Sequence, residues 1–218
     1  AEYLAGSDSA HRKQQGQIFT PPEIAQFMAG LFDAIPTSFR LLDAGAGAGS
    51  LSVAVCERVL RSRKPRQLHI NAFETEPVLA DLLSSIFAEC KLRLEDAGHK
   101  FSYSVEREDF ISAAAPHLEE QHMLFQAGVP CDFDGVIMNP PYFKLRKNSD
   151  HARLMERVVH GQPNAYAFFL ALAAALLKPN GQLVAITPRS FCNGLYFRGF
   201  RHWFFKHVSL DYIHLFES

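Results

Sequence analysis

The sequence predicts an α/β protein built on a doubly wound, mostly parallel sheet. Strand-like and helix-like runs alternate from residue 20 onward, which favours parallel strands joined by right-handed helical crossovers. A glycine-rich turn follows the first strand, the usual place for a ligand-binding turn in such a sheet. The 218 residues are 48% hydrophobic, enough to bury one complete core. We expect a single domain over residues 17–218, after a polar, flexible lead-in over 1–16.

The first helix is expected directly after residue 20. Thr20-Pro21-Pro22-Glu23 has the form of a capping box, with a hydroxyl at the helix start, prolines in the first turn and a carboxylate three residues later. The apolar side chains that follow recur at helical spacing and predict a face packed on the sheet. They are Ile24, Phe27, Met28, Leu31, Phe32 and Ile35.

The next segment predicts a strand, a tight turn and a helix. The strand over 39–43 ends at Asp43, and Ser50 is expected to cap a helix over 51–60. Between them, glycines at alternate positions remove the Cβ atoms where a backbone has to run close to a ligand. These glycines are Gly45, Gly47 and Gly49.

The composition of this turn favours a cationic ligand. A dinucleotide-binding turn would have glycine at the position of Ser50, so the phosphate-binding pattern is incomplete. The Asp43 carboxylate would repel phosphate but suits a sulfonium or ammonium group. We therefore interpret Asp43, Gly45 and Gly47 as part of the cofactor site of a methyltransferase rather than of a nicotinamide enzyme.

Two further strands lead to acidic residues. The second strand, over 68–74, ends at Glu74, where an acid in this fold class commonly binds a ribose. The third strand, over 101–106, leads to Asp109 and Phe110. The helix expected between them, over 77–94, carries an apolar stripe made of Leu79, Leu82, Leu83, Ile86, Phe87 and Cys90.

A fourth strand, over 133–138, stops at Asn139-Pro140-Pro141-Tyr142. The two prolines fix the backbone and make this tip rigid. Such a tip suits a planar amine whose lone pair is delocalised into a ring. The Asn139 side-chain oxygen and the Pro140 carbonyl can each accept one N–H, and Tyr142 offers a face on which the ring can stack. Catalysis at this tip would come chiefly from positioning.

In these residues and in their order, the chain resembles the γ-class N6-adenine DNA methyltransferases of restriction-modification systems. The resemblance implies a Rossmann-like fold, S-adenosyl-L-methionine as the cofactor, and adenine flipped out of double-stranded DNA as the substrate. It also implies that Phe19 and Thr20 cover the cofactor, that Asp109 accepts the cofactor's adenine amine, and that Phe110 packs on its ring. Asn139 would contact both cofactor and substrate.

The same resemblance assigns the remaining aromatic role to Phe197, which would stack on the flipped adenine together with Tyr142. Members of the family usually carry a further strand and a C-terminal target-recognition region, which this sequence lacks. We therefore expect site specificity to come from a C-terminal recognition domain in a longer protein, or from a separate restriction subunit.

The last third of the chain completes the expected alternation. We expect a helix over 164–178, a strand over 182–187, a helix that begins in the stretch 188–201 and ends at Phe205, and a sixth strand over 210–217. Within that last helix, a stripe of core residues is predicted at Leu195, Phe200 and Phe204. The segment 113–131 is mixed in composition and predicts no role.

Basic residues are concentrated after the tip. Residues 1–139 carry 12 Lys+Arg against 19 Asp+Glu, whereas residues 140–218 carry 10 against 4. The positive part predicts a surface for a polyanion, although ordinary solvated charge explains any single residue as well. We expect the segment 143–163 to become ordered over nucleic acid. The candidates for phosphate contacts are Lys144, Arg146, Lys147, Arg198 and Arg201.

Composition also predicts the compartment. The longest apolar run, over 165–177, is too short to span a membrane. The four cysteines lie far apart in the sequence, without the spacing of metal ligands. We therefore expect a cytoplasmic protein with reduced thiols, no metal and no membrane partner.

Two other functions remain open at this point. A protein-glutamine or RNA methyltransferase could use the same Asn-Pro-Pro-Tyr motif, since a side-chain amide is also a planar, weak nucleophile. A non-catalytic DNA-binding module of a restriction system could keep the fold and depend on another chain for specificity.

Overall fold

The computed structural model describes residues 19–118, 129, 131–146, 148–155 and 164–216, apart from the side chain of Tyr196. The predicted lead-in over 1–16, Lys147 and much of the expected segment over 143–163 lie outside the described residues.

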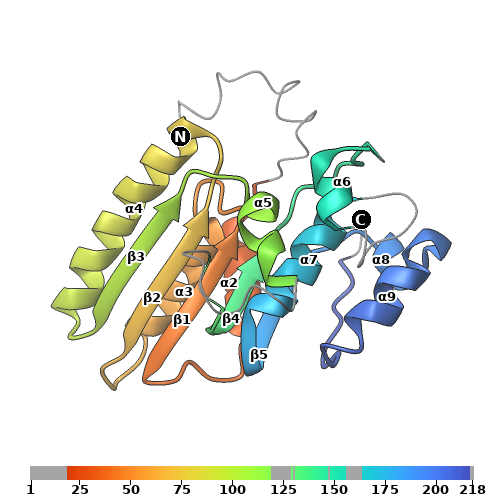
Figure 1. Ribbon diagram of the computed structural model, residues 1–218. Helices are drawn as coiled ribbons and strands as arrows, with labels where there is room; N and C mark the ends of the chain where they lie inside the picture. The colour runs from red at the N-terminus through yellow and green to blue at the C-terminus, as the bar shows by residue number, and fades with distance from the viewer. Residues whose placement is uncertain (1–18, 119–128, 130, 147, 156–163, 217–218) are drawn as a thin grey trace.

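A five-stranded, wholly parallel sheet forms the centre of the described structure (Figure 1). The strand order is β3-β2-β1-β4-β5. This order, together with the helices between the strands, confirms the predicted doubly wound α/β fold. The strands are β1 (Ser38–Ala44), β2 (Gln67–Phe73), β3 (Lys100–Glu106), β4 (Phe133–Met138) and β5 (Leu177–Ala185).

Helices cover both faces of the sheet, each over its own cluster of buried side chains. One face packs against α2 (Pro22–Gly30), α3 (Ser50–Leu60) and α4 (Pro77–Asp96). The other face packs against α5 (Phe110–Ala114), α7 (Ala165–Leu176) and α9 (Arg198–Phe204). Shorter turns complete the described elements: η2 (Ala115–Leu118), α6 (Asp150–Leu154), α8 (Ser190–Asn193) and η3 (Leu195–Phe197).

The order in which strands are added to the sheet changes sides between β1 and β4. β2 and β3 extend the sheet on one side of β1, whereas β4 lies on the other side, in register at Leu41 with Gly135 and at Asp43 with Ile137. Ligands of open α/β sheets bind at the carboxyl ends of the strands at this switch point. The glycine turn after β1 and the Asn139 tip after β4 both lie at that point.

Two predicted helix caps are wrong. α2 begins at Pro22 with Pro21 as its N-cap residue and has no side-chain cap, so Thr20 stands one residue too early to act as a cap. α3 includes Ser50 as its first residue, and its N-cap is Gly49, in the left-handed conformation. The hydroxyl of Thr20 and the side chain of Ser50 instead face the cavity described below.

The boundaries around β5 and α9 also differ from the expectation. β5 follows α7 directly, and its register against β4 shifts between Phe133 and Gly135. The expected helix up to Phe205 is broken into α8, η3 and α9, because the backbone at Gly194 is extended. Phe200 and Phe204 are buried as predicted, whereas Leu195 is 86% exposed. In α4, Leu82 of the predicted inner stripe is exposed as well.

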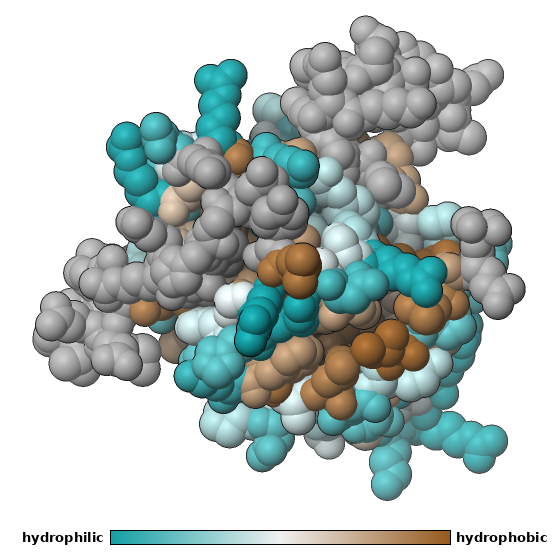
Figure 2. All heavy atoms as spheres, turned by 90° about the vertical axis from the view of Figure 1, so that its right-hand side faces the viewer, coloured by the Kyte–Doolittle hydropathy of each residue, from teal (hydrophilic) through white to brown (hydrophobic). Residues whose placement is uncertain are grey.

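The predicted sixth strand is absent from the described residues, since 208–216 form neither strand nor helix. Phe27 in α2 makes ring contacts with His214 and Phe216. Figure 2 looks onto the side of the molecule that carries α8 and α9, where exposed hydrophobic side chains lie next to hydrophilic ones. The apolar side chains of this final segment stay about half exposed: Leu210, Tyr212, Ile213, Leu215 and Phe216.

No helix in the described part of the chain is long and apolar enough to cross a membrane. The four cysteines are free thiols, two buried and two exposed.

Candidate active site

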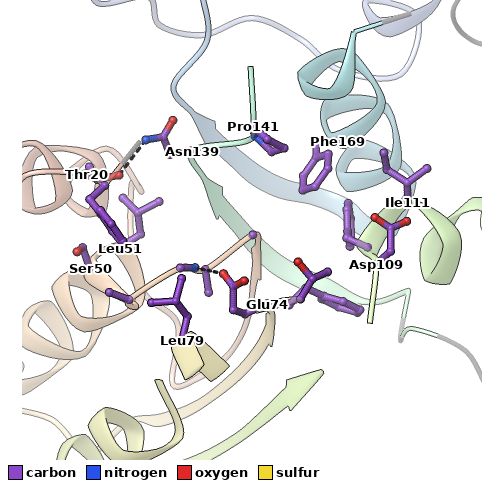
Figure 3. Close-up of a pocket in the computed structure, with 18 of the residues that line it drawn as sticks. Thr20, Ser50, Leu51, Glu74, Leu79, Asp109, Ile111, Asn139, Pro141 and Phe169 are labelled. Carbon is purple, nitrogen blue, oxygen red and sulfur yellow. Dashed lines mark hydrogen bonds between the residues drawn. The ribbon is translucent and has the colours of Figure 1, made fainter. Parts of the chain in front are cut away.

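A cavity of about 430 Å³ opens at the carboxyl ends of the central strands (Figure 3). Its size suits a small-molecule cofactor. The predicted cofactor-binding residues line it, with the exception of Asp43. They are Phe19, Thr20, Gly45, Gly47, Glu74, Asp109, Phe110 and Asn139.

The glycine turn forms the floor of this cavity. Gly45 and Gly47 have φ angles of 97° and 55°, which favour glycine. The Phe73 carbonyl at the end of β2 accepts hydrogen bonds from the backbone N–H groups of Gly45 and Ala46, at 3.1 and 2.9 Å. A Cβ at Gly45 would lie 3.4 Å from the Phe169 ring, so a side chain there would take up cavity space.

Glu74 is held in place by the turn that it faces. Its Oε2 accepts from the Gly47 N–H at 2.9 Å, and its Oε1 accepts from the Glu76 N–H at 2.8 Å. Burial raises the pKa of this carboxyl, while those two backbone donors act in the opposite direction. Each carboxylate oxygen can accept more than one hydrogen bond, so Glu74 retains capacity for a pair of ligand hydroxyls.

Asp43 does not reach the cavity, contrary to its predicted role at a sulfonium. It is fully buried beneath the turn, where Oδ2 accepts from the Ser52 hydroxyl at 2.6 Å. Its Oδ1 is buried without a hydrogen-bond partner among the described residues. Burial raises the pKa of Asp43 to about 7. Asp43 therefore links β1 to α3 through its hydrogen bond with Ser52. From the sequence alone, an acid at the end of a strand could serve either this structural role or a ligand contact.

The Asn139 amide is oriented from two sides. Its Nδ2 donates to Thr20 Oγ1 at 3.1 Å, and the Tyr142 hydroxyl lies 2.5 Å from its Oδ1 and 3.1 Å from the Ile186 carbonyl oxygen. Figure 3 shows the nitrogen turned toward Thr20 and the oxygen turned away. These contacts fix the plane of the amide, with Nδ2 held at Thr20 and Oδ1 at the Tyr142 hydroxyl.

The aromatic residues expected to hold a base surround one buried ring. Tyr166 is fully buried, and its ring centroid lies 6.3 Å from that of Tyr142 and 5.2 Å from that of Phe197. Tyr142 and Phe197 are both partly exposed. Burial raises the pKa of the Tyr142 hydroxyl, which keeps it a hydrogen-bond donor. Pro140 is buried between the two parts of the site.

Asp109 and Phe110 stand at the opposite end of the cavity from Asn139. Asp109 caps α5, since its Oδ1 accepts from the Ser112 N–H at 2.8 Å. The Phe110 ring is buried and packs edge-to-face on Phe73, with 5.2 Å between centroids, and against Phe169 at 5.1 Å. The cap accounts for the acid at this position, and the core packing accounts for the aromatic residue.

The candidate phosphate-binding residues fall into two groups. Lys144, Arg146 and Arg198 are exposed. Arg201 is partly buried, and its Nη1 donates to the carbonyl oxygens of Phe191 and Gly194 at 2.9 and 3.0 Å. Arg201 therefore stabilises the backbone at the break between α8 and α9.

Sequence reasoning missed several cavity residues. Apolar walls come from Leu51, Leu79, Ile111 and Phe169, which periodicity alone marks as core. His151 also lines the cavity, although it falls in a segment with little periodicity that was assigned only to nucleic acid. In the described residues, no three His, Cys, Asp or Glu side chains are grouped so that they could hold a metal ion.

The fold matches that of solved methyltransferases. A class I S-adenosylmethionine-dependent methyltransferase from Listeria monocytogenes superposes with a TM-score of 0.63 at 18% identity, covering 94% of this chain and 55% of its own. A type I restriction-modification methyltransferase subunit from Streptococcus thermophilus gives a TM-score of 0.58 at 22% identity, over 94% and 42%. The chain thus shares the Rossmann-like fold of solved methyltransferases.

Comparison with known protein sequences shows the family to which the chain belongs. The chain is 36% identical to the type II methyltransferase M.BsuBI of Bacillus subtilis over 95% of its length, and 33% identical to M.PstI of Providencia stuartii over 97%. Residues 51–218 match the family described as Eco57I restriction-modification methylase, and the chain belongs to this family. It spans 40% of the length of both relatives.

A more distant relative is named for a tRNA substrate. The tRNA1(Val) (adenine(37)-N6)-methyltransferase of Aliivibrio fischeri is 25% identical over 79% of this chain and 62% of its own length.

Proposed function

We propose that the chain is the catalytic domain of a site-specific DNA methyltransferase of a restriction-modification system, acting on the N6 amine of adenine. The observation that carries the proposal is the position of Asn139. This amide lines the same cavity as the glycine turn, Glu74 and Asp109, and its orientation is set by Thr20 and Tyr142. The family relationship to type II methyltransferases supports the DNA substrate.

The residues around the cavity fit S-adenosylmethionine. Glu74 would accept hydrogen bonds from the ribose hydroxyls, and Phe19, which lies close to Gly47, would cover the methionine end together with Thr20. Asp109 would accept the adenine amine of the cofactor, and Phe110 would pack on its ring. When bound, the cofactor supplies an electrophilic methyl group on a sulfonium centre.

The chain's own contribution at the target is orientation. Asn139 Oδ1 and the Pro140 carbonyl would accept the two hydrogens of the adenine amine, which turns the nitrogen lone pair toward the cavity. Tyr142 and Phe197 would hold the flipped base between their rings. The amine loses its proton to solvent afterwards. Positioning and fixed dipoles together can lower such a barrier by on the order of 10 kcal/mol.

The polyanion would meet the exposed side chains that follow the tip. Lys144 and Arg146 lie just after Tyr142, and Arg198 begins α9 directly after Phe197, so both groups flank the base-binding aromatics. We propose that double-stranded DNA binds across them. Sequence specificity would come from the further length of the relatives, as a C-terminal recognition domain, or from a separate restriction subunit.

A second candidate function is adenine-N6 methylation of RNA. It is favoured by the relationship to the tRNA1(Val) methyltransferase, whose name states adenine-N6 chemistry. The same Asn139 geometry would serve both nucleic acids, since the reacting amine is the same.

Transfer of a labelled methyl group to separate pools of DNA, RNA and protein, followed by nucleoside analysis, tests the proposal. We expect N6-methyladenine in DNA. Asn139→Ala should lower the transfer rate by roughly 100-fold or more, because both the acceptor and its orientation are lost. The affinity for S-adenosylhomocysteine should stay within a few-fold of wild type.

The matched control is Asn148→Ala, which removes an exposed amide from the segment after the tip. It should leave the transfer rate unchanged. Label in RNA or in protein glutamine would contradict the DNA proposal, and an unchanged rate in Asn139→Ala would contradict the role of the amide.

A further inference from the structure

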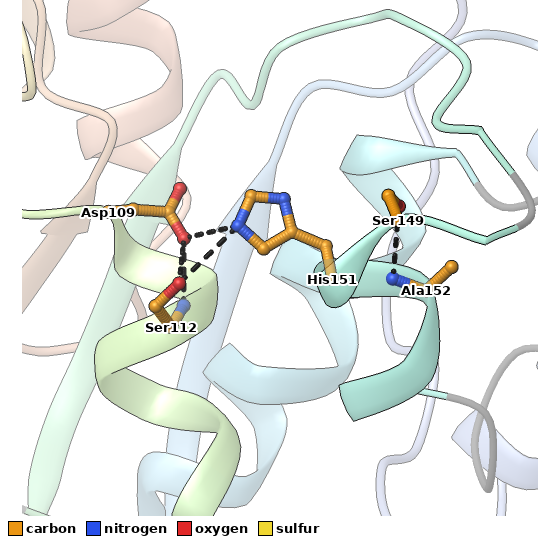
Figure 4. A network of polar contacts seen from close by, with 5 residues as sticks. All are labelled: Asp109, Ser112, Ser149, His151 and Ala152. Atoms are coloured by element: carbon orange, nitrogen blue, oxygen red, sulfur yellow. Dashed lines mark hydrogen bonds and ion pairs between the residues drawn. The ribbon is translucent and has the colours of Figure 1, made fainter.

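A histidine from the segment after the catalytic tip reaches the far end of the cofactor cavity. His151 lies in α6, and its Nε2 is 2.8 Å from Asp109 Oδ1, at the start of α5 (Figure 4). Both side chains are partly exposed, at 29% and 38%, and both line the cavity. A contact between these two elements therefore closes one side of the cavity.

The contact completes a set of donors on a single carboxylate oxygen. Asp109 Oδ1 accepts from the N–H and the hydroxyl of Ser112, each at 2.8 Å, in addition to His151. The Ser112 hydroxyl is also 3.4 Å from the imidazole Nε2. Within the described part of the chain, Asp109 Oδ2 has no hydrogen bond, and Figure 4 shows it turned away from these donors. The carboxylate is thus fixed through one oxygen and offers the other.

The path from the tip to His151 is tied down at successive points. The Phe143 carbonyl accepts from the Ala165 N–H at 3.0 Å, and the Ser149 N–H donates to the Arg146 carbonyl at 3.0 Å. Ser149 then caps α6 by accepting from the Ala152 N–H at 3.2 Å. The residues between Tyr142 and α6 include the exposed Lys144 and Arg146. His151 and Phe143 are the residues of this segment that line the cavity.

We propose that His151 is a positioning residue for the cofactor. It holds the Asp109 carboxylate through Oδ1 so that Oδ2 faces the adenine amine. The proposal rests on the function proposed above, which places the cofactor's adenine at Asp109.

Calorimetric binding of S-adenosylhomocysteine to the full chain tests the role. His151→Ala should weaken binding roughly 3- to 10-fold, which corresponds to the loss of one hydrogen bond that orders a ligand-binding group. His151→Gln keeps an N–H donor on a side chain of similar reach and should restore most of the affinity. The matched control is Asp150→Asn on the same helix, whose carboxylate pairs only with Arg153 among the described residues. Its affinity should stay within about two-fold of wild type.

A ligand that lacks the adenine amine distinguishes a positioning role of His151 from a general loosening of the cavity in the His151→Ala variant. The analogue of S-adenosylhomocysteine with unsubstituted purine in place of adenine gives Asp109 nothing to accept. The His151→Ala penalty should therefore disappear with this analogue, whereas a general loosening of the cavity would weaken both ligands equally.

Equal penalties for the two ligands, or no penalty for either, would overturn the role of His151. Because these are binding measurements, they stand apart from methyl transfer. A chain that binds S-adenosylhomocysteine in the expected pattern but methylates no DNA would contradict the proposed function alone.

Discussion

At the scale of single residues, Asp43 shows how burial changes what an acid does. Its carboxyl titrates near 3.8 when exposed and at about 7 in the folded chain, because burial disfavours the charged form. Between these pH values the folded state retains a proton that the unfolded state has lost. The contribution of Asp43 is therefore fully present below pH 4 and falls as the pH rises through 7.

Asp43→Asn should remove this pH dependence. The variant cannot ionise, so its stability relative to wild type should rise between pH 5 and pH 8 by on the order of 2–3 kcal/mol. Urea unfolding at the two pH values measures the difference. Asp150→Asn, which alters an exposed carboxyl, should show no such trend. A gap between Asp43→Asn and wild type that is the same at both pH values would contradict the prediction.

The sequence predicted the residues of the cavity more successfully than it predicted the helix caps. Glu74, Asp109 and Asn139 were recognisable because each follows a strand, and parallel strands deliver their carboxyl ends to one edge. The same reasoning wrongly placed Asp43 in the cavity. The side chain of a residue near the end of a strand can point into the protein interior as readily as into a cavity at the strand ends. No periodicity marks His151, whose partner lies 42 positions earlier in the chain.

At the scale of elements, the junction between the glycine turn and α3 depends on close packing. Gly49 has a φ of 82°, and a Cβ at this position would lie 2.5 Å from Leu83 Cδ1 in α4. A side chain would therefore strain the backbone and press on the neighbouring helix.

Gly49→Ala should lower the free energy of unfolding by about 2 kcal/mol, the sum of left-handed strain and overpacking. Gly30→Ala is the matched control, because nothing lies within 4 Å of a Cβ at the end of α2. It should change stability by less than about 0.5 kcal/mol or raise it slightly. Thermal unfolding of both variants measures the effect, and equal shifts would show that the Leu83 contact is unimportant.

The strands and the longer helices were predictable because their apolar patterns match the element periods. The failures lie where a tertiary contact overrides the pattern. The expected long helix breaks at Gly194, where the backbone is extended and runs too close to the Ser190 carbonyl oxygen to leave room for a Cβ. The apolar alternation over 210–216 has the sequence pattern of a strand, but in the described structure no neighbouring strand pairs with it.

At the scale of the whole molecule, charge is unevenly distributed along the chain. The acidic excess lies before the tip and the basic excess after it. Binding that neutralises phosphates becomes weaker as salt increases, with a slope set by the number of contacts.

Lys144→Ala and Arg146→Ala should each weaken DNA binding about equally for different sequences and reduce the slope of log K against log salt by about 1. Fluorescence anisotropy over a range of salt concentrations measures this slope. Arg63→Ala is the control, since it removes an exposed positive charge between α3 and β2, remote from the strand ends that form the site. A slope that is unchanged in the first two variants would remove these residues from the DNA surface.

A line of polar contacts crosses the top of the sheet, from Thr20 through Asn139 and Tyr142 to the backbone at Ile186. Its two ends belong to segments 166 positions apart, one ahead of the first helix and one beyond the last strand. Any ligand or further domain that shifts either end will turn the amide between them. In the proposed reaction, the rate of the chemical step would therefore depend on two places far apart on the chain, without any change in the groups proposed to contact the purine.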